Sequence, residues 1–196
     1  IKELEKTISP VRSYRLEGYL FPDTYEFYTD SSEVEVIRRF LSNFDRKFNE
    51  IYYDRAKELG LTVDEVIILA SMIEKETKFL SEFEVVSSVF HNRLNNRINF
   101  PYLESDATIM YAIQIKTGER PNTLKETTFE SPYNTYSNKG FPPGPIANPG
   151  YNAITCALYP SKTSYYYFVS RKDGTSIFSK TYNEHLAAIA EIKKEE

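Results

Sequence analysis

The chain has 196 residues, of which 41% are hydrophobic and 27% are charged, so it can bury a core and is not disordered. Its net charge of −4 argues against a nucleic-acid partner, because phosphate binding leaves a basic footprint. A single cysteine, Cys156, excludes an intramolecular disulfide and a multi-cysteine metal site. The length suits one domain over residues 1–196, with a short charged lead-in at residues 1–10.

The first quarter of the chain predicts a turn-rich segment followed by helices. Residues 11–28, VRSYRLEGYLFPDTYEFY, combine aromatic residues with Gly and Pro, which is typical of strand, turn and extended chain. Ser31 or Ser32 can cap a helix whose apolar residues recur at helical spacing up to Phe48. A second helix, or a continuation of the first, is expected to end at Gly60.

Residues 62–80, TVDEVIILASMIEKETKFL, predict a buried helix that carries a carboxylate on an inward face. Thr62 and Glu65 have the spacing of a capping box. Glu74 falls within the apolar arc of the helical wheel, whereas Glu76 faces elsewhere. A carboxyl group on such a face loses solvation, which raises its pKa and suits a general acid. The alternative for Glu74 is a structural carboxylate, paired with an arginine or with backbone N–H groups.

Two further helices are expected in the middle of the chain. Ser81 and Glu84 repeat the capping-box spacing and predict a helix through Leu94, followed by a loop. Ser105 or Asp106 then caps the next helix.

The C-terminal third contains the main Pro/Gly tract and the predicted strands. Residues 140–150, GFPPGPIANPG, predict a stiff, ordered surface loop, with a short helix over 151–158 packed under it. The runs 165–170 and 175–179 flank a turn and predict a β-hairpin, and a last helix opens at Thr181. The fold class is therefore α+β, mainly helical, with a few short antiparallel strands that include this hairpin.

Metal-assisted and nucleophilic chemistry have little support. His91 and His185 are far apart in sequence and have no ligand-like neighbours, which disfavours a zinc site. The chain has no Gly-rich phosphate loop and no G-x-S-x-G motif, and Cys156 lies in an apolar run. We therefore expect no metal and no cofactor, and carboxylate acid–base chemistry remains, with Glu74 as the candidate acid. Three other carboxylates could reach the site from elsewhere in the chain: Asp23, Glu104 and Asp106.

Several sequence blocks occur together in an order that is specific to one known family. They are LEGYLFPDTYEF (16–27), ILASMIEKET (68–77), VSSVFHNRL (86–94), SDATIMYA (105–112), SPYNTY (131–136) and GFPPGPIANPG (140–150). On these blocks the chain resembles the catalytic domain of the endolytic murein transglycosylases of the YceG-like (MltG) family. Two positions depart from the pattern: Glu104 stands where Gln is frequent, and Tyr159 where His is common.

The resemblance implies a bacterial enzyme that cuts peptidoglycan glycan strands internally, between N-acetylmuramic acid and N-acetylglucosamine, leaving 1,6-anhydro ends. The family's catalytic glutamate maps to Glu74, which would act as acid and then as base, with no metal, cofactor or carboxylate nucleophile. An N-terminal transmembrane helix and a LysM-like module are expected outside this chain. The expected location is the cell membrane, single-pass, with the catalytic domain on the extracytoplasmic side. Cell-wall synthesis proteins are further expected partners.

Five residues are the candidate substrate ligands, because hydroxyls, amides and aromatic faces suit N-acetyl groups and sugar rings: Ser105, Asp106, Tyr133, Asn134 and Tyr136. The alternative is local, with the first two as helix caps and the others as packing in a turn. Glu17 and Asp23 line the cleft or fix an unusual turn. Glu76 orients the surroundings of Glu74 or forms a surface ion pair.

Two rival functions stay open. A peptidoglycan-binding or cell-wall-synthesis scaffold module would not need catalysis and would be free to lose Glu74. A conventional muramidase would need a second carboxylate across the cleft, at roughly 5–9.5 Å depending on mechanism.

Overall fold

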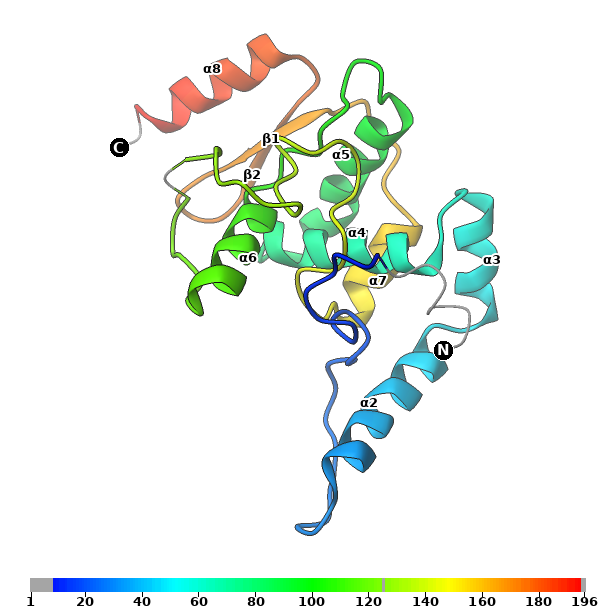
Figure 1. The fold of residues 1–196 in the computed structure, drawn as a ribbon. Coiled ribbons are helices and arrows are strands. Elements are labelled where there is room, and N and C mark those ends of the chain that lie inside the picture. Colours follow the sequence, from blue (N-terminus) through cyan, green and yellow to red (C-terminus); the bar gives the residue numbers. More distant parts are fainter. Residues whose placement is uncertain (1–8, 125, 195–196) are drawn as a thin grey trace.

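The computed structural model describes residues 9–124 and 126–194, so most of the predicted lead-in lies outside the described residues (Figure 1). This part of the chain forms seven α-helices, one short 3₁₀ helix and a two-stranded sheet, which confirms the mainly helical α+β class. In order they are α2 (Glu33–Lys47), α3 (Glu50–Glu58), α4 (Val63–Glu76), η1 (Leu80–Glu82), α5 (Phe83–Asn95), α6 (Asp106–Thr117), α7 (Tyr151–Leu158), β1 (Tyr167–Ser170), β2 (Ser176–Ser179) and α8 (Tyr182–Ile192).

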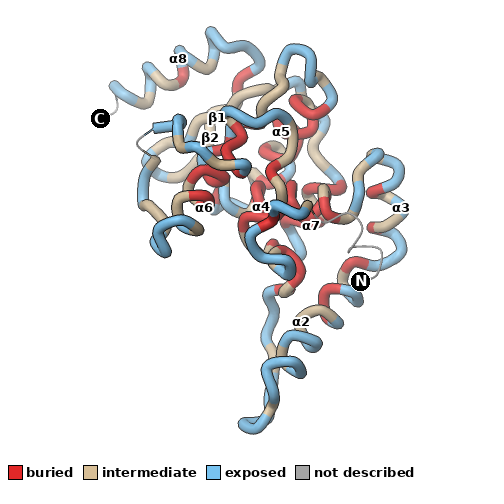
Figure 2. The backbone as a smooth tube through the Cα atoms, viewed as in Figure 1, coloured by how far each residue is buried: buried red, intermediate tan, exposed pale blue. Residues whose placement is uncertain are grey.

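Helix α4 runs through the centre of the molecule and is buried along nearly its whole length (Figure 2). It packs against α7 most extensively and also against α5 and α6. The predicted capping box is present: Thr62 Oγ1 accepts from the Glu65 N–H at 3.2 Å, and the Glu65 carboxylate accepts from the Thr62 N–H at 2.8 Å. The predicted buried helix is therefore confirmed.

The predicted end of this helix, near Leu80, is wrong, because α4 ends at Glu76. Thr77 has extended backbone angles (φ −137°, ψ 150°). Its hydroxyl donates to Glu82 Oε2 at 2.9 Å and accepts from the Phe79 N–H at 3.2 Å, so local side-chain bonding replaces the next helical turn. Glu76 is consequently the last residue of the helix.

The other predicted helix caps are confirmed in two cases and wrong in one. Ser32 and Thr181 cap α2 and α8 as expected. The box predicted from Ser81 and Glu84 does not form, because η1 leads directly into α5 and the α5 N-cap has no side-chain hydrogen bond. The Glu84 carboxylate instead accepts from the Ser161 hydroxyl at 3.2 Å.

The extended N-terminal segment, which we name the arm, lies beside α2, and both project from the body (Figure 1). No strand is assigned between residues 11 and 28, so the strand predicted there is wrong. The extended chain has no described strand beside it and packs its rings on a helix instead. The Tyr25 and Phe40 rings lie 4.5 Å apart, and the Tyr25 hydroxyl donates to the Phe21 carbonyl at 2.6 Å.

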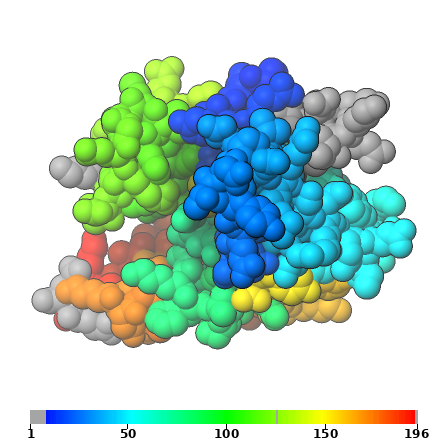
Figure 3. Space-filling view, turned by 90° about the horizontal axis from the view of Figure 1, so that it is seen from below, coloured from blue at the N-terminus to red at the C-terminus, as the bar shows by residue number. Residues whose placement is uncertain are grey.

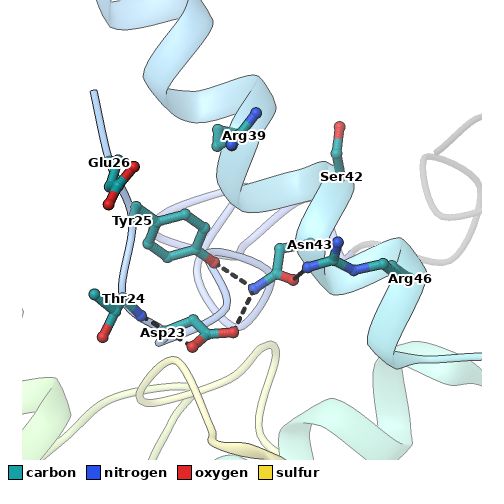
Figure 4. A pocket seen from close by; sticks show the side chains of 8 residues that line it. All are labelled: Asp23, Thr24, Tyr25, Glu26, Arg39, Ser42, Asn43 and Arg46. Atoms are coloured by element: carbon teal, nitrogen blue, oxygen red, sulfur yellow. Dashed lines mark hydrogen bonds between the residues drawn. The ribbon is translucent and has the colours of Figure 1, made fainter. Parts of the chain in front are cut away.

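A polar cavity of about 440 Å³ lies between the arm and α2 (Figure 4). The Asn43 amide donates to Asp23 Oδ2 at 3.0 Å and to the Tyr25 hydroxyl at 2.8 Å, and Arg46 donates to Asn43 Oδ1 at 2.6 Å. These groups satisfy one another, so Asp23 ties the arm to α2 and does not line the cavity that contains Glu76, described below.

The Pro/Gly tract at residues 140–150 is an ordered loop, as predicted, but its predicted surface position is wrong. Ile146 is buried, and its N–H donates to Ser71 Oγ at 3.0 Å. The Gly150 N–H donates to Glu74 Oε2 at 3.1 Å. Both bonds hold the loop against α4. The prolines of the loop lack N–H donors, so these contacts, and not regular secondary structure, fix its position.

The C-terminal hairpin and the last helix are confirmed. Strands β1 and β2 pair antiparallel, with Phe168 opposite Phe178, and α8 packs on both strands. In the described residues, no helix combines the length and the apolar character needed to cross a membrane.

Candidate active site

A cavity of about 590 Å³ opens between the last turn of α4, the start of α6, and the hairpin with α8. Figure 3 shows the molecule hollowed between the green residues around α6 and the orange and red residues of the hairpin and α8. We name it the aromatic cavity, because its lining combines three carboxylates with a series of rings: Glu76, Glu104, Asp106, Tyr136, Tyr166, Tyr167, Phe168 and Tyr182. Apolar ring faces with a few convergent polar groups are typical of ligand sites.

Glu76 enters this cavity from the end of α4 and meets the N-terminus of α6. The Ser105 hydroxyl donates to Glu76 Oε1, and the Ala107 N–H also bonds the carboxylate. Burial raises the pKa of Glu76 to about 7, and the nearby Asp106 charge acts in the same direction. The bond from Ser105 and the positive charge of Arg120 offset part of this increase. Glu76 is therefore suited both to give and to accept a proton near neutral pH.

Three of the predicted site residues meet at the cavity. Ser105 is fully buried at the N-cap of α6, yet its hydroxyl bonds Glu76 and makes no helix-capping bond. Asp106 Oδ1 accepts from the Tyr136 hydroxyl at 2.6 Å, and both residues line the cavity. Burial raises the pKa of Tyr136, followed by its bond to Asp106, so this hydroxyl remains a donor at neutral pH.

The other two predicted ligands, Tyr133 and Asn134, lie away from the cavity lining. Both are buried, and the Tyr133 hydroxyl accepts from the Ser13 N–H at 3.3 Å. The Asn134 amide donates to two backbone carbonyls at 2.9 and 2.8 Å, and its Oδ1 accepts from the Tyr136 N–H at 2.9 Å. These contacts correspond to the local alternative, in which both side chains hold the loop that presents Tyr136.

Glu74 is half-buried, and its described contact is the bond to the Gly150 N–H. It does not line the aromatic cavity. This contact corresponds to the structural alternative, a carboxylate paired with backbone N–H. The catalytic role expected for Glu74 stays a prediction, and the environment expected of an embedded acid surrounds Glu76 instead.

Arg93 fixes two walls of the cavity and was missed from the sequence. It is buried, and it donates to the Tyr166 carbonyl and to Glu104 Oε2, each at 2.7 Å. Its guanidinium also lies 5.1 Å from the Tyr167 ring centroid. It thereby joins β1 to the loop before α6. The sequence does contain a signal for its burial: Arg93 follows Val89 by four residues and therefore lies on the apolar face of the predicted helix.

His185 of α8 also lines the cavity. Its ring stacks on Tyr167 at 5.3 Å, and burial lowers its pKa, which keeps the ring neutral. Its Nδ1 is buried and has no hydrogen-bond partner among the described residues. Within the described part of the chain, no three His, Cys, Asp or Glu side chains are grouped so as to hold a metal ion.

Comparison with known proteins agrees on one family. Residues 2–191 match the model of the YceG-like family. A crystal structure of a yceG-like protein from Listeria monocytogenes superposes with a TM-score of 0.81 at 35% identity, covering 96% of this chain and 62% of that one.

Two curated relatives carry the name endolytic murein transglycosylase. The chain is 37% identical to that of Bacillus subtilis (strain 168) over 172 residues, which cover 87% of this chain and 46% of the relative. It is 34% identical to that of Streptococcus pneumoniae (strain ATCC BAA-255 / R6) over 183 residues, covering 91% and 32%. The chain thus spans less than half the length of these curated relatives.

Proposed function

Because the chain belongs to the YceG-like family, we propose that it is the catalytic part of an endolytic peptidoglycan lytic transglycosylase. It would cut the bond between N-acetylmuramic acid and N-acetylglucosamine inside glycan strands and leave 1,6-anhydro ends. The observation that carries this proposal is Glu76, a partly buried carboxyl group with a pKa raised to about 7 in a cavity lined by aromatic rings.

Glu76 supplies both proton transfers of the reaction. In its protonated form it donates to the glycosidic oxygen while the C1–O bond breaks with oxocarbenium-like character. The resulting carboxylate takes the proton of the muramyl C6 hydroxyl as that oxygen bonds to C1. The proton returns to Glu76, no water is consumed, and the products are a 1,6-anhydro end and a free 4-hydroxyl group.

Neighbouring groups support this cycle. Asp106 lines the same cavity, and its negative charge favours the positive charge that develops at C1. The Ser105 hydroxyl donates to Glu76 Oε1 and stabilises the carboxylate that must exist between the two transfers. The Tyr166 and Tyr182 rings line the same cavity and offer aromatic surface for sugar stacking.

Asp106 also provides the basis for a rival, a muramidase that adds water. It places a second carboxylate in the cavity of Glu76, as such an enzyme requires. We favour transglycosylation, because the named relatives are transglycosylases and because the Tyr136 hydroxyl occupies Asp106 Oδ1.

The substrate also suggests where the enzyme works. Peptidoglycan lies outside the cytoplasmic membrane, so we propose an extracytoplasmic catalytic domain attached to the cell membrane. Cell-wall synthesis proteins would be natural neighbours there.

The test is mass spectrometry of products from purified peptidoglycan strands treated with the wild type, Glu76→Gln and Glu74→Gln. We expect 1,6-anhydro ends from the wild type and a loss of about 10² to 10⁴-fold in Glu76→Gln. Glu74→Gln keeps an acceptor for the Gly150 N–H and is expected to stay within tenfold of the wild type (~1.4 kcal/mol).

Each other outcome points to a different conclusion. Loss of activity in Glu74→Gln but not in Glu76→Gln would return the acid role to Glu74. Reducing ends that carry an added water, lost in Asp106→Asn, would make the protein a muramidase. Strand binding without cleavage would support the scaffold alternative.

A further inference from the structure

A second cavity, of about 650 Å³, shares the last turn of α4 with the aromatic cavity. We name it the basic cavity, after the lining residues Lys75 and Arg120; Tyr14, Gln114 and Asn148 also line it. The proposed function leaves this cavity without a role.

Within the described part of the chain, the positive groups of the basic cavity have few partners. Lys75 is exposed and forms no ion pair with a described residue. Arg120 is partly buried, and its hydrogen-bond contact is the weak one from Nη2 to Met110 Sδ at 4.0 Å. A guanidinium has five N–H donors, so most of those on Arg120 have no hydrogen-bond partner among the described residues. The lining also contains the acidic residue Glu17, whose Oε2 accepts from the Tyr111 hydroxyl at 2.5 Å. Among the described residues, Glu17 forms no ion pair with Lys75 or Arg120.

The frame around these cations is held in place without them. Asn148 Oδ1 accepts from the N–H groups of Gly18 and Leu20 at 2.8 and 3.2 Å. Ile146, also in the lining, is bonded to Ser71 of α4. Lys75 and Arg120 are therefore not needed to build this wall and remain available to a ligand.

The two cavities lie within reach of one extended substrate. Lys75 lines one and its neighbour Glu76 lines the other, and the Arg120 charge acts on Glu76. Along α6, Asp106 borders the aromatic cavity and Gln114 the basic one, roughly 12 Å apart at about 1.5 Å per residue. A strand with its scissile bond at Glu76 can thus reach the basic cavity with a substituent.

We propose that the basic cavity binds a carboxylate of the stem peptide carried by the muramic acid at the cut. The inference rests on the proposed function, because it takes peptidoglycan as the substrate. The peptide is amide-linked to the lactyl group of muramic acid and carries free carboxylates, which Lys and Arg recognise through charge-assisted hydrogen bonds. The cavity would then select strands by their peptides, whereas the aromatic cavity holds the sugars.

The test is titration calorimetry with the disaccharide GlcNAc-MurNAc carrying a stem tetrapeptide, against the same compound with its peptide carboxylates converted to amides. We expect the wild type to bind the free acid about tenfold more tightly, as one charge-assisted bond would give. Lys75→Gln should abolish this preference and Lys75→Arg should keep it. Lys162→Gln, an exposed lysine that lines neither cavity, is the matched control.

Equal binding of both compounds by the wild type would overturn the inference. So would an equal loss of affinity for both compounds in Lys75→Gln, because the lysine would then contact the sugar or the fold. This disaccharide lacks the scissile MurNAc–GlcNAc bond, so the result does not depend on cleavage. A protein that shows the preference but cuts no strands would overturn the proposed function alone.

Discussion

Each end of α4 carries a carboxylate, buried at Asp64 and partly buried at Glu76, and the two groups have opposite surroundings. At the first turn, Asp64 accepts from Arg12 Nη1 at 2.8 Å and from the Tyr19 hydroxyl at 2.6 Å, so charge and hydrogen bonds are matched. At the last turn, Glu76 has a hydroxyl and a backbone donor, no ion pair within 4 Å among the described residues, and the like charge of Asp106 nearby.

The difference shows that partners, and not burial alone, decide what a buried carboxylate does. Arg12 makes the ionised form of Asp64 part of the fold, joining the N-terminal segment to the central helix. Glu76 lacks such a partner, so burial raises its pKa to about 7 and both protonation states are accessible. One end of the helix is thus suited to stability and the other to proton transfer.

The largest expected effect is on stability, from Asp64→Ala. It leaves the Arg12 guanidinium buried without its carboxylate, which should lower the free energy of unfolding by about 3–5 kcal/mol. Urea unfolding followed by circular dichroism measures this loss. At a temperature where the variant is folded, its cleavage rate should keep the pH dependence of the wild type. A changed pH dependence would mean that the two ends of α4 are coupled.

Glu76→Gln should have the reverse effect and stabilise the protein at high pH. The folded pKa of about 7 lies above the unfolded value of 4.5, so folding takes up a proton between these pH values. The free energy of unfolding contributed by Glu76 therefore falls as pH rises from 4.5 to 7, by up to about 3 kcal/mol. Gln cannot ionise, so the variant should exceed the wild type by up to this amount at pH 8 and match it near pH 4. Parallel stability curves between pH 4 and 8 would contradict the raised pKa.

The same contrast explains what could be predicted from the sequence. The caps at Ser32, Thr62 and Thr181 were predictable, because a capping box depends on residues three positions apart. The end of α4 was not, because Thr77 leaves the helix to bond Glu82, and apolar periodicity does not register such a bond.

The choice between Glu74 and Glu76 depends on contacts made far along the chain. The helical wheel placed Glu74 on the inward face, but the surroundings of Glu76 come from Ser105 and Asp106, about thirty residues later. The resemblance names the segments of the candidate site, and the fold decides which of their side chains meet. For the same reason Tyr136 reaches the cavity whereas its neighbour Asn134 holds the loop.

Ser105→Ala sharpens the comparison at the Glu76 end of α4. In the wild type, cleavage by a protonated Glu76 should decline as pH rises through about 7. The Ser105 hydroxyl stabilises the ionised carboxylate, so its removal should raise the pKa of Glu76 further. The decline should then move to higher pH by about one unit, as expected for the loss of one hydrogen bond to a charged group. An unshifted or lowered midpoint in the rate profile would show that this bond does not control Glu76.

Thr62→Ala is the matching change at the structural end, and its effect should be the smallest. Thr62 Oγ1 caps the first turn of α4 at 3.2 Å from the Glu65 nitrogen, in an exposed position. Loss of an N-cap hydroxyl costs about 1 kcal/mol, so the urea midpoint should fall slightly. The midpoint of the rate profile should not move, because Thr62 and Glu76 lie at opposite ends of a 14-residue helix, roughly 20 Å apart at about 1.5 Å per residue. Ser105→Ala and Thr62→Ala each remove one hydroxyl bond to α4. A shift in the rate profile with both variants would therefore show that general loosening of this helix sets the pH dependence, and not the bond to Glu76.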